Sequence, residues 1–186
     1  MALLECLPAN VQQKFNINIS TSLIFKRCNT ATQKQENVYA IFSNMDKEQN
    51  TSQLFQKYFD QVSCDDFRCE QCQGLGCFKQ SSIVTSSDII LLRVVRNGLE
   101  AWKRNITPND SLLVDEKLYR LKAVQTFIPH ASSLSTNDGI EISQGHYITH
   151  LHRNTHCIKC DDTHISVVKG SPKKRGCVLL RSGKRR

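Results

Sequence analysis

Hydrophobic and polar positions alternate with period two over much of this chain, which is the pattern of β-strands. Phe15, Ile17 and Ile19 alternate with asparagines, and residues 22–26 can continue that strand. A second strand is expected over residues 35–43, followed by a polar loop. Later segments with strand character are residues 78–84, 89–95, 112–114, 118–128, 146–152 and 155–159.

One segment has helical rather than strand periodicity. Apolar residues recur at helical spacing in residues 52–62, and Thr51 and Ser52 before them are good N-caps, so a short amphipathic helix is predicted there. Ile89 to Val95 is the most apolar run and is expected to be a central strand buried on both faces. The chain therefore predicts an α+β fold, a mostly antiparallel sheet with one short helix.

The strand at residues 146–152 carries candidate chemistry. It places His146, His150 and His152 on one face. A turn near Asn154 would return the chain antiparallel and bring Asp161 or Asp162 back beside His146. A histidine held by a carboxylate is part of a catalytic triad, but it needs a thiol or hydroxyl nucleophile.

Other uses of these residues remain open. A histidine near an aspartate is commonly a structural hydrogen-bonded pair. Alternatively, the strand and the residues after its turn could bind zinc as a small metal-binding interaction domain, because imidazoles and thiolates on adjacent strands can share one ion. The side chains in that alternative are His150, His152, His156, Cys157 and Cys160.

Composition limits the class of protein. Of 186 residues, 39% are hydrophobic and 23% charged, and no apolar run approaches the ~18 residues of a transmembrane helix. Residues 1–20 lack the features of a secretory signal, so the nine cysteines are expected in a reducing compartment, the cytoplasm or the nucleus.

The net charge of +8 is concentrated at the C-terminal end. Eight of the 25 basic residues follow the last acidic residue, Asp162, which leaves 25 − 8 = 17 basic against 17 acidic residues. Residues 169–186 are therefore expected to be a flexible basic tail, with nonspecific polyanion contact or nuclear import as alternatives to simple solvation. The eight are Lys169, Lys173, Lys174, Arg175, Arg181, Lys184, Arg185 and Arg186.

The order of these features resembles the C-terminal half of the ubiquitin-specific protease catalytic domain, from Phe15 to Val168. The motifs that carry the resemblance are Tyr119-Arg-Leu-Lys-Ala-Val124, Gly145-His146-Tyr147 and Cys160-Asp161-Asp162. The resemblance implies the palm and fingers of a papain-like cysteine protease domain over residues 1–168, with the fingers at about 20–85 and the palm at about 86–168.

The resemblance also implies roles for particular residues. His146 would be the general base, Asp161 its orienting partner, and Asp162 would stand beside it. Gly145 and Tyr147 would contact ubiquitin. The reaction implied is thiol-dependent hydrolysis of the bond at the ubiquitin C-terminus, and this chemistry requires no cofactor.

The resemblance implies a structural zinc in the fingers, but the expected ligand set is incomplete. Cys69 and Cys72 form a Cys-x-x-Cys pair, whereas Cys28 has no second cysteine three residues later. The fourth ligand would be Cys64, Cys77 or water. We therefore expect substoichiometric zinc.

No segment of this chain matches the N-terminal Cys box that supplies the nucleophile in that family. Cys6 precedes Leu7-Pro8 and lies only 22 residues before Cys28, and no upstream asparagine accompanies it. We therefore expect the isolated chain to be inactive. An alternative function is a catalytically dead ubiquitin-binding module.

Overall fold

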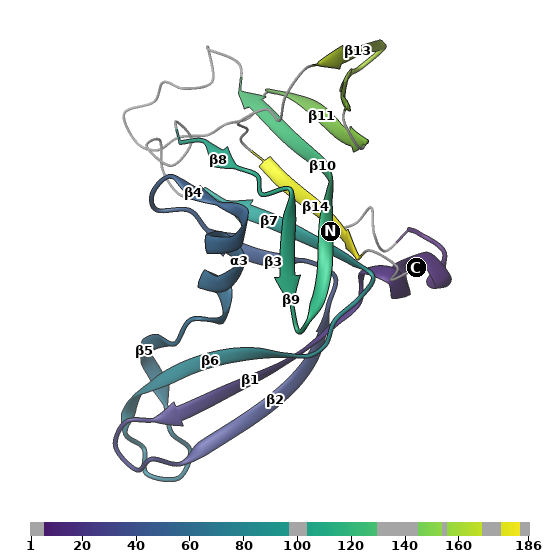
Figure 1. Cartoon of the computed structure of the whole chain (residues 1–186). Coiled ribbons are helices and arrows are strands. Elements are labelled where there is room, and N and C mark those ends of the chain that lie inside the picture. The colour runs from purple at the N-terminus through teal and green to yellow at the C-terminus, as the bar shows by residue number, and fades with distance from the viewer. Residues whose placement is uncertain (1–5, 97–103, 130–144, 154–155, 169–175, 183–186) are drawn as a thin grey trace.

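A computed structural model describes residues 6–96, 104–129, 145–153, 156–168 and 176–182. Most of these residues belong to β-strands, and the helices are short, which confirms the α+β class. Two sheets dominate: one projects as a long arm, and the other carries the later strands (Figure 1). Within the described residues, no helix is long and apolar enough to cross a membrane.

Short helices come before and after the first strands, and the second half of the chain is built of strands. In chain order the elements are α2 (Ala9–Gln12), η1 (Gln13–Phe15), β1 (Ile17–Phe25), β2 (Ala31–Val38), β3 (Ile41–Asn44), β4 (Gln49–Asn50), α3 (Thr51–Phe59), β5 (Val62–Arg68), β6 (Leu75–Thr85), β7 (Ile89–Val95), β8 (Ile106–Thr107), β9 (Ser111–Val114), β10 (Lys117–Pro129), β11 (Gly145–Arg153), β12 (His156–Asp161), β13 (His164–Val168) and β14 (Gly176–Ser182).

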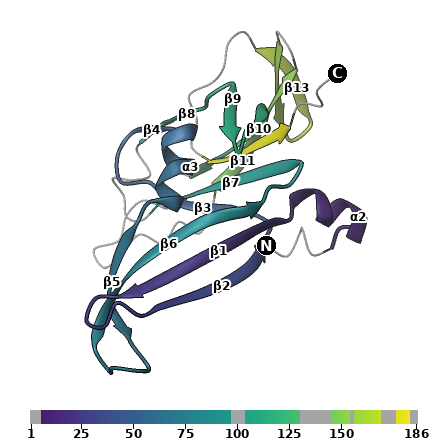
Figure 2. The same ribbon diagram turned by 60° about the horizontal axis from the view of Figure 1, so that its bottom comes forward.

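The arm is a four-stranded antiparallel sheet in the order β2-β1-β6-β5. Ile17 and Ile19 at the base of β1 are fully buried and join the main core, while every residue of β2 before Val38 is exposed. Figure 2 shows β1, β2 and β6 running out from the body to the turns at the tip. The base of the arm is therefore fixed by burial in the main core, and its outer part by strand pairing and a small buried cluster of Phe25, Cys69 and Cys77.

The larger sheet has the order β13-β12-β11-β10-β14-β7-β3, with β9 also paired to β10. All its pairs are antiparallel except β3 with β7. One face of its centre buries an apolar core against α3 and β8. The fully buried side chains there include Ile41, Leu54, Ile90, Leu92, Ile106, Tyr119, Val124, Val178 and Leu180.

Helix α3 was predicted, but its limits differ from the prediction. Its N-cap is Asn50, whose side chain accepts a hydrogen bond from the Gln53 backbone at 2.9 Å, while Gln53 Oε1 accepts from the Asn50 backbone at 3.0 Å. This capping box satisfies two backbone donors, so neither Thr51 nor Ser52 is the cap. Val62 begins β5 instead of ending the helix.

Two strand predictions also need correction. The strand expected over residues 35–43 is divided, because the chain bends at Tyr39 and Ala40 and passes from the arm, in β2, to the larger sheet, in β3. In β7 only one face is deeply buried: Ile90 and Leu92 are fully inside, whereas Ile89 and Leu91 are half-buried and Arg93 is exposed. The alternation of apolar and polar residues correctly identifies strands that pair, but it does not show which of the two sheets a strand joins.

The prediction of a flexible tail over residues 169–186 is wrong for residues 176–182. These residues form β14, which lies between β10 and β7, and Val178 and Leu180 are fully buried. The basic composition of the segment concealed this short apolar run. Arg181 lies exposed on β14, and the other seven basic residues fall outside the described residues.

Candidate functional site

The hairpin of β11 and β12 holds the candidate site. The strands pair antiparallel, as the sequence predicted, and the register places Thr149 opposite Cys160 and His152 opposite Cys157. The predicted turn at Asn154 lies outside the described residues. This register places Asp161 at the end of β12, one diagonal step from His146 near the start of β11.

His146 and Asp161 are in direct contact. Nε2 of His146 donates a hydrogen bond to Oδ1 of Asp161, and both side chains are half-buried. The second oxygen, Oδ2, accepts a hydrogen bond from Nζ of Lys159 at 2.5 Å. With Nε2 protonated, the neutral imidazole has its lone pair on Nδ1, so Nδ1 is the atom that can accept a proton.

Asp162 lies on the other side of the imidazole. Its Oδ2 is 3.7 Å from Nδ1 of His146, and its side chain is 77% exposed. It follows β12 in the turn to β13 with φ of 50°, a left-handed conformation that aspartate tolerates better than most residues. Asp162 therefore has a structural role in the turn, and its charge stabilises the imidazolium once Nδ1 is protonated.

These contacts shift both pKa values in the direction expected of an ion pair. The hydrogen bond to Asp161 raises the pKa of His146, and the charge of Asp162 adds to this, while partial burial and the charge of Lys159 oppose it. Hydrogen bonds from Lys159 and His146 lower the pKa of Asp161 to about 2. At neutral pH Asp161 is therefore ionised.

The three side chains could also be considered for a metal ion, because one ligand atom from each of His146, Asp161 and Asp162 lies within 4.8 Å of the others. A cation at this position would have to compete with the ammonium group of Lys159, which already binds Asp161 at 2.5 Å. An imidazole oriented by an ionised carboxylate is the chemistry that the contacts favour.

Gly145 and Tyr147 flank His146 on β11. Tyr147 is 59% exposed, and its ring packs against Phe127 of β10 with 4.8 Å between centroids. A Cβ atom added to Gly145 would lie 2.1 Å from the Phe127 ring and 2.7 Å from the Ile128 carbonyl oxygen. Glycine is therefore required at position 145 because the backbone there lies very close to β10.

We expect Gly145→Ala to lower the free energy of unfolding by about 1–3 kcal/mol, the usual cost of forcing an extra group into a packed site. The added methyl group would have to displace the Phe127 ring or separate Gly145 from its partner Pro129. Denaturant unfolding measures the effect. Thr149→Ala, farther along β11, is the control, and equal stability of the two variants would contradict the packing argument.

The alternative zinc site in this hairpin does not form among the described residues. His150 is 1% exposed, and its neighbours on β12 do not converge on it as a metal-ligand group. His152 Nε2 is 4.0 Å from the Cys157 sulfur, and the described part of the chain adds no third ligand to this pair. Cys160 lies on the opposite face of β12 from Cys157, because the two are three residues apart on a strand.

The cysteines of the arm do converge. The sulfurs of Cys28, Cys69 and Cys72 lie within 4.8 Å of one another near its tip, with 3.6 Å between Cys28 and Cys69. Sulfurs on a tetrahedral zinc are about 3.8 Å apart, so this spacing fits. Cys64 and Cys77 face each other across β5 and β6 and are not members of the group.

The protonation of these thiols also suits a metal site. Hydrogen bonds from the side chain and backbone of Thr30 lower the pKa of Cys28 to about 7. A hydrogen bond from the Gly74 backbone lowers the pKa of Cys72, but the contact with Cys28, burial and the contact with Cys69 together raise that pKa above its usual value. One thiolate therefore forms readily, and a cation would be needed to hold two or three together. The described residues offer three protein ligands and no fourth.

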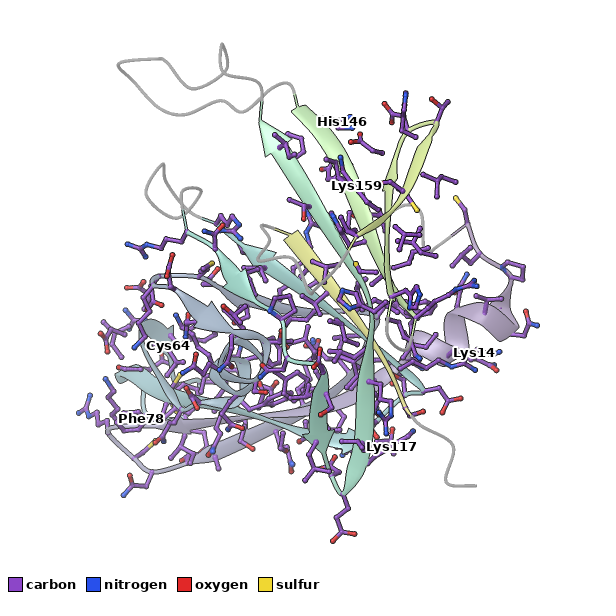
Figure 3. All side chains as sticks on the ribbon, turned by 45° about the horizontal axis from the view of Figure 1, so that its top comes forward. Lys14, Cys64, Phe78, Lys117, His146 and Lys159 are labelled. Atoms are coloured by element: carbon purple, nitrogen blue, oxygen red, sulfur yellow. The ribbon has the colours of Figure 1, made fainter. Side chains whose placement is uncertain are left out.

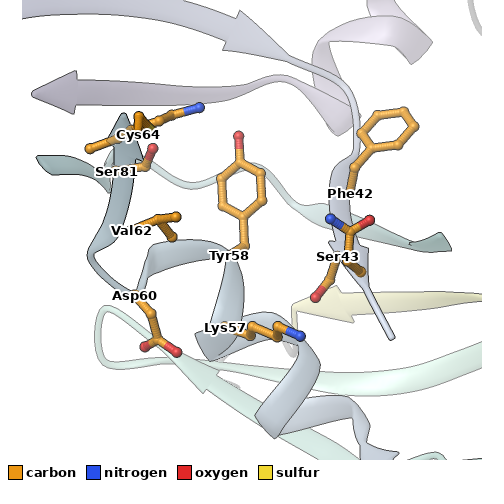
Figure 4. A pocket seen from close by; sticks show the side chains of 10 residues that line it. Phe42, Ser43, Lys57, Tyr58, Asp60, Val62, Cys64 and Ser81 are labelled. Carbon is orange, nitrogen blue, oxygen red and sulfur yellow. The ribbon is translucent and has the colours of Figure 1, made fainter. Parts of the chain in front are cut away.

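A cavity of about 430 Å³ lies between the arm and α3 (Figure 4). Tyr58, Lys57 and Asp60 line it from the helix side, and Cys64 and Ser81 from the arm. Burial raises the pKa of the Tyr58 phenol, which therefore stays a hydrogen-bond donor. Cys64 and His146 lie far apart in Figure 3, so this cavity is separate from the histidine site.

Sequence reasoning identified the residues that meet at His146 but missed Lys159. Lys159 and Asp161 are two residues apart on β12, so a strand must place them on the same face, beside each other. Once β12 was predicted, that spacing was sufficient to include the lysine.

No protein-family model matches the chain, and no curated protein matches it in sequence. Solved structures do match. A chain of the SAGA DUB module with Ubp8, Sgf11, Sus1 and Sgf73 bound to monoubiquitin has a TM-score of 0.75 at 12% identity, over 96% of this chain and 43% of that one. A yeast SAGA DUB module with mutant Sgf73 gives 0.73 at 12% identity, over 98% and 47%.

A third structure, the SAGA module bound to ubiquitin aldehyde, gives a TM-score of 0.71 at 13% identity, over 98% of this chain and 46% of that one. The chain thus spans less than half the length of each of these three solved chains. At this level of identity the likeness concerns the fold. The described residues adopt a fold similar to part of a chain in these SAGA DUB module structures.

Proposed function

We propose that this chain supplies the general-base half of a deubiquitinating cysteine protease site. His146 takes the proton of a thiol, and Asp161 orients the imidazole. The cysteine comes from a polypeptide segment that the described residues do not contain. The observation that carries the proposal is the hydrogen bond from His146 Nε2 to an ionised Asp161, which leaves the basic Nδ1 for the thiol.

The fold supports the choice of substrate. The structural neighbours include modules bound to monoubiquitin and to ubiquitin aldehyde, and their chains extend well beyond the part that this chain matches. On this basis the substrate class is a ubiquitin conjugate. Tyr147, exposed beside His146, would contact the ubiquitin C-terminus, while Gly145 maintains the strand geometry that positions both.

The test is to complete the domain. A ubiquitin-specific protease segment carrying a Cys box would be fused to this chain or supplied separately, and hydrolysis of a fluorogenic ubiquitin C-terminal amide measured. We expect turnover from the completed domain and none from the isolated chain. Turnover by the isolated chain, or its labelling at Cys6, Cys157 or Cys160 by a thiol-reactive ubiquitin probe, would contradict the proposal.

Ubiquitin binding without turnover is the second candidate function. It is favoured by one observation: among the histidine, cysteine and acidic side chains of the described residues, those that meet at His146 are Asp161 and Asp162, and no cysteine joins them. Titration of the isotope-labelled chain with ubiquitin, followed by NMR, separates the candidates. Binding around Tyr147 combined with an inactive completed domain would support the binding module.

We also propose that Cys28, Cys69 and Cys72 hold a structural zinc with partial occupancy. Zinc added to the metal-free chain should raise its melting temperature, because binding energy becomes folding energy. Cys69→Ser should abolish the rise, and Cys6→Ser, at an exposed thiol outside the group, should preserve it. Metal analysis that returned one tightly held zinc per chain would contradict a three-ligand site.

The proposed zinc site needs its cysteines in the reduced thiol form, which a reducing compartment maintains. We therefore expect the protein in the cytoplasm or the nucleus. Polyanion contact through the basic residues after Asp162 stays a prediction, since nearly all of them lie outside the described residues.

A further inference from the structure

Lys159 is the charged side chain nearest to the His146–Asp161 pair that has no role in the proton transfer described above. We propose that Lys159 is a positioning residue: it binds the second oxygen of Asp161, holds the carboxylate toward His146 and places a positive charge close to the imidazole. This role rests on the proposed function of His146 as a base.

The geometry supports a positioning role through Asp161. Lys159 Nζ lies 2.5 Å from Oδ2 of Asp161, while Oδ1 of the same carboxylate accepts the hydrogen bond from His146. Each oxygen therefore has one cationic or N–H donor, which leaves a single orientation of the carboxyl group. All three side chains are half-buried, so the contacts are less screened by water than those of a surface pair.

The charges around His146 show why a lysine is useful here. Two carboxylates, Asp161 and Asp162, face the imidazole, and both raise its pKa. A base that is protonated at working pH cannot accept a proton. Among the described residues, Lys159 is the cation that opposes them, and its charge lowers the pKa of His146.

The other elements beside the site add little charge. From β10, the residue opposite His146 is Ile128, which has none. From β13, the residue opposite Asp161 is His164, which is exposed and whose Nδ1 lies 3.5 Å from the Thr163 hydroxyl. Lys159 therefore has a balancing effect on His146 that neither of these two neighbouring side chains can replace.

The experiment is an NMR titration of the imidazoles in the isolated chain, which needs no catalytic activity. Lys159→Met should raise the pKa of His146 and reduce the population of the Nε2–H tautomer, since Asp161 loses one of its two donors. Lys159→Arg, which keeps the charge, should restore both values toward wild type. His146→Gln assigns the resonance.

Lys122→Met is the matched control, because it removes an exposed lysine on β10 about 20 Å along the sheet from the His146 position, beyond the Debye length of roughly 8–10 Å. It should leave His146 unchanged. In the completed domain, Lys159→Met should lower kcat/KM several-fold more at about pH 6 than at about pH 8.5, because the neutral imidazole is depleted at low pH.

An unchanged or lowered pKa of His146 in Lys159→Met, with an unchanged tautomer, would overturn the proposal. If Lys159→Met does not fold, Lys159→Gln is titrated instead and decides in the same way. Failure of the proposed function looks different: the completed wild-type domain would show no turnover, whereas the imidazole titration would still report whether Lys159 controls His146.

Discussion

In the completed domain, His146→Ala is expected to lower kcat/KM by on the order of 10³-fold. General-base catalysis contributes about 10²–10⁴-fold, and members of a triad act as a unit, so loss of the base removes most of the combined effect. The loss should appear in kcat and not in ubiquitin binding, because His146 acts on a proton. Steady-state kinetics with a fluorogenic ubiquitin substrate measures it.

His152→Gln is the matched control, on the same face of β11 and about 20 Å from His146. It should retain turnover. His150 is not a suitable control, since it is almost fully buried and its replacement by alanine would test stability. Retained turnover in His146→Ala would remove the basis of the proposed function.

The pH dependence follows from the direction of the pKa shift at His146. The pKa of His146 is raised by Asp161, so activity should fall with decreasing pH at a higher pH than for an unperturbed histidine. Asp161→Asn removes the largest cause of the shift, and the acid limb should then move to lower pH while the maximum rate falls. The ion pair also stabilises the fold below the unfolded-state pKa of about 6.5, and this contribution is lost as pH rises through the raised value.

Deletion of residues 176–186 is expected to prevent stable folding. This deletion removes β14, separates β10 from β7 and exposes the core around Val178 and Leu180, each of which is fully buried. Two such side chains contribute roughly 1.5–3 kcal/mol each, and the lost strand pairing adds to this, against a total stability of about 5–15 kcal/mol for a typical domain. Circular dichroism and thermal unfolding measure the loss.

Two controls separate β14 from the charge of the segment. A chain that ends at Ser182 loses basic residues but keeps the strand, and it should fold normally. Leu180→Ala should cost about 2–5 kcal/mol, and Leu179→Ala, half-buried on the opposite face, distinctly less. Normal folding of the chain without residues 176–186 would show that β14 is dispensable.

Local patterns were sufficient to predict much of the fold. Alternation identified β1, β10 and β11, because a strand with one buried face carries that periodicity in its own residues. The same alternation, with a turn near Asn154, placed Asp161 or Asp162 beside His146. The hairpin is local, so its pairing depends on few residues and on no distant part of the chain.

The limits of α3 were less certain from sequence, since the cap depends on which side chain reaches the free backbone groups. Asn50 does so with Gln53, although Thr51 and Ser52 are equally good capping residue types. Residue type alone favoured Thr51 and Ser52 and did not identify Asn50.

Most of the strands, the one longer helix, a hairpin that brings Asp161 or Asp162 to His146, and the candidate thiols could be predicted from the residues alone. The structure was needed to show that β2 and β3 belong to different sheets, that Gly145 is required by Phe127, and that β14 lies in the core. The alternation of apolar and polar residues shows which face of a strand a residue occupies, but it does not show which other strand is its neighbour in the sheet. A short apolar run among basic residues becomes core only because β10 and β7 present unpaired edges on either side of it.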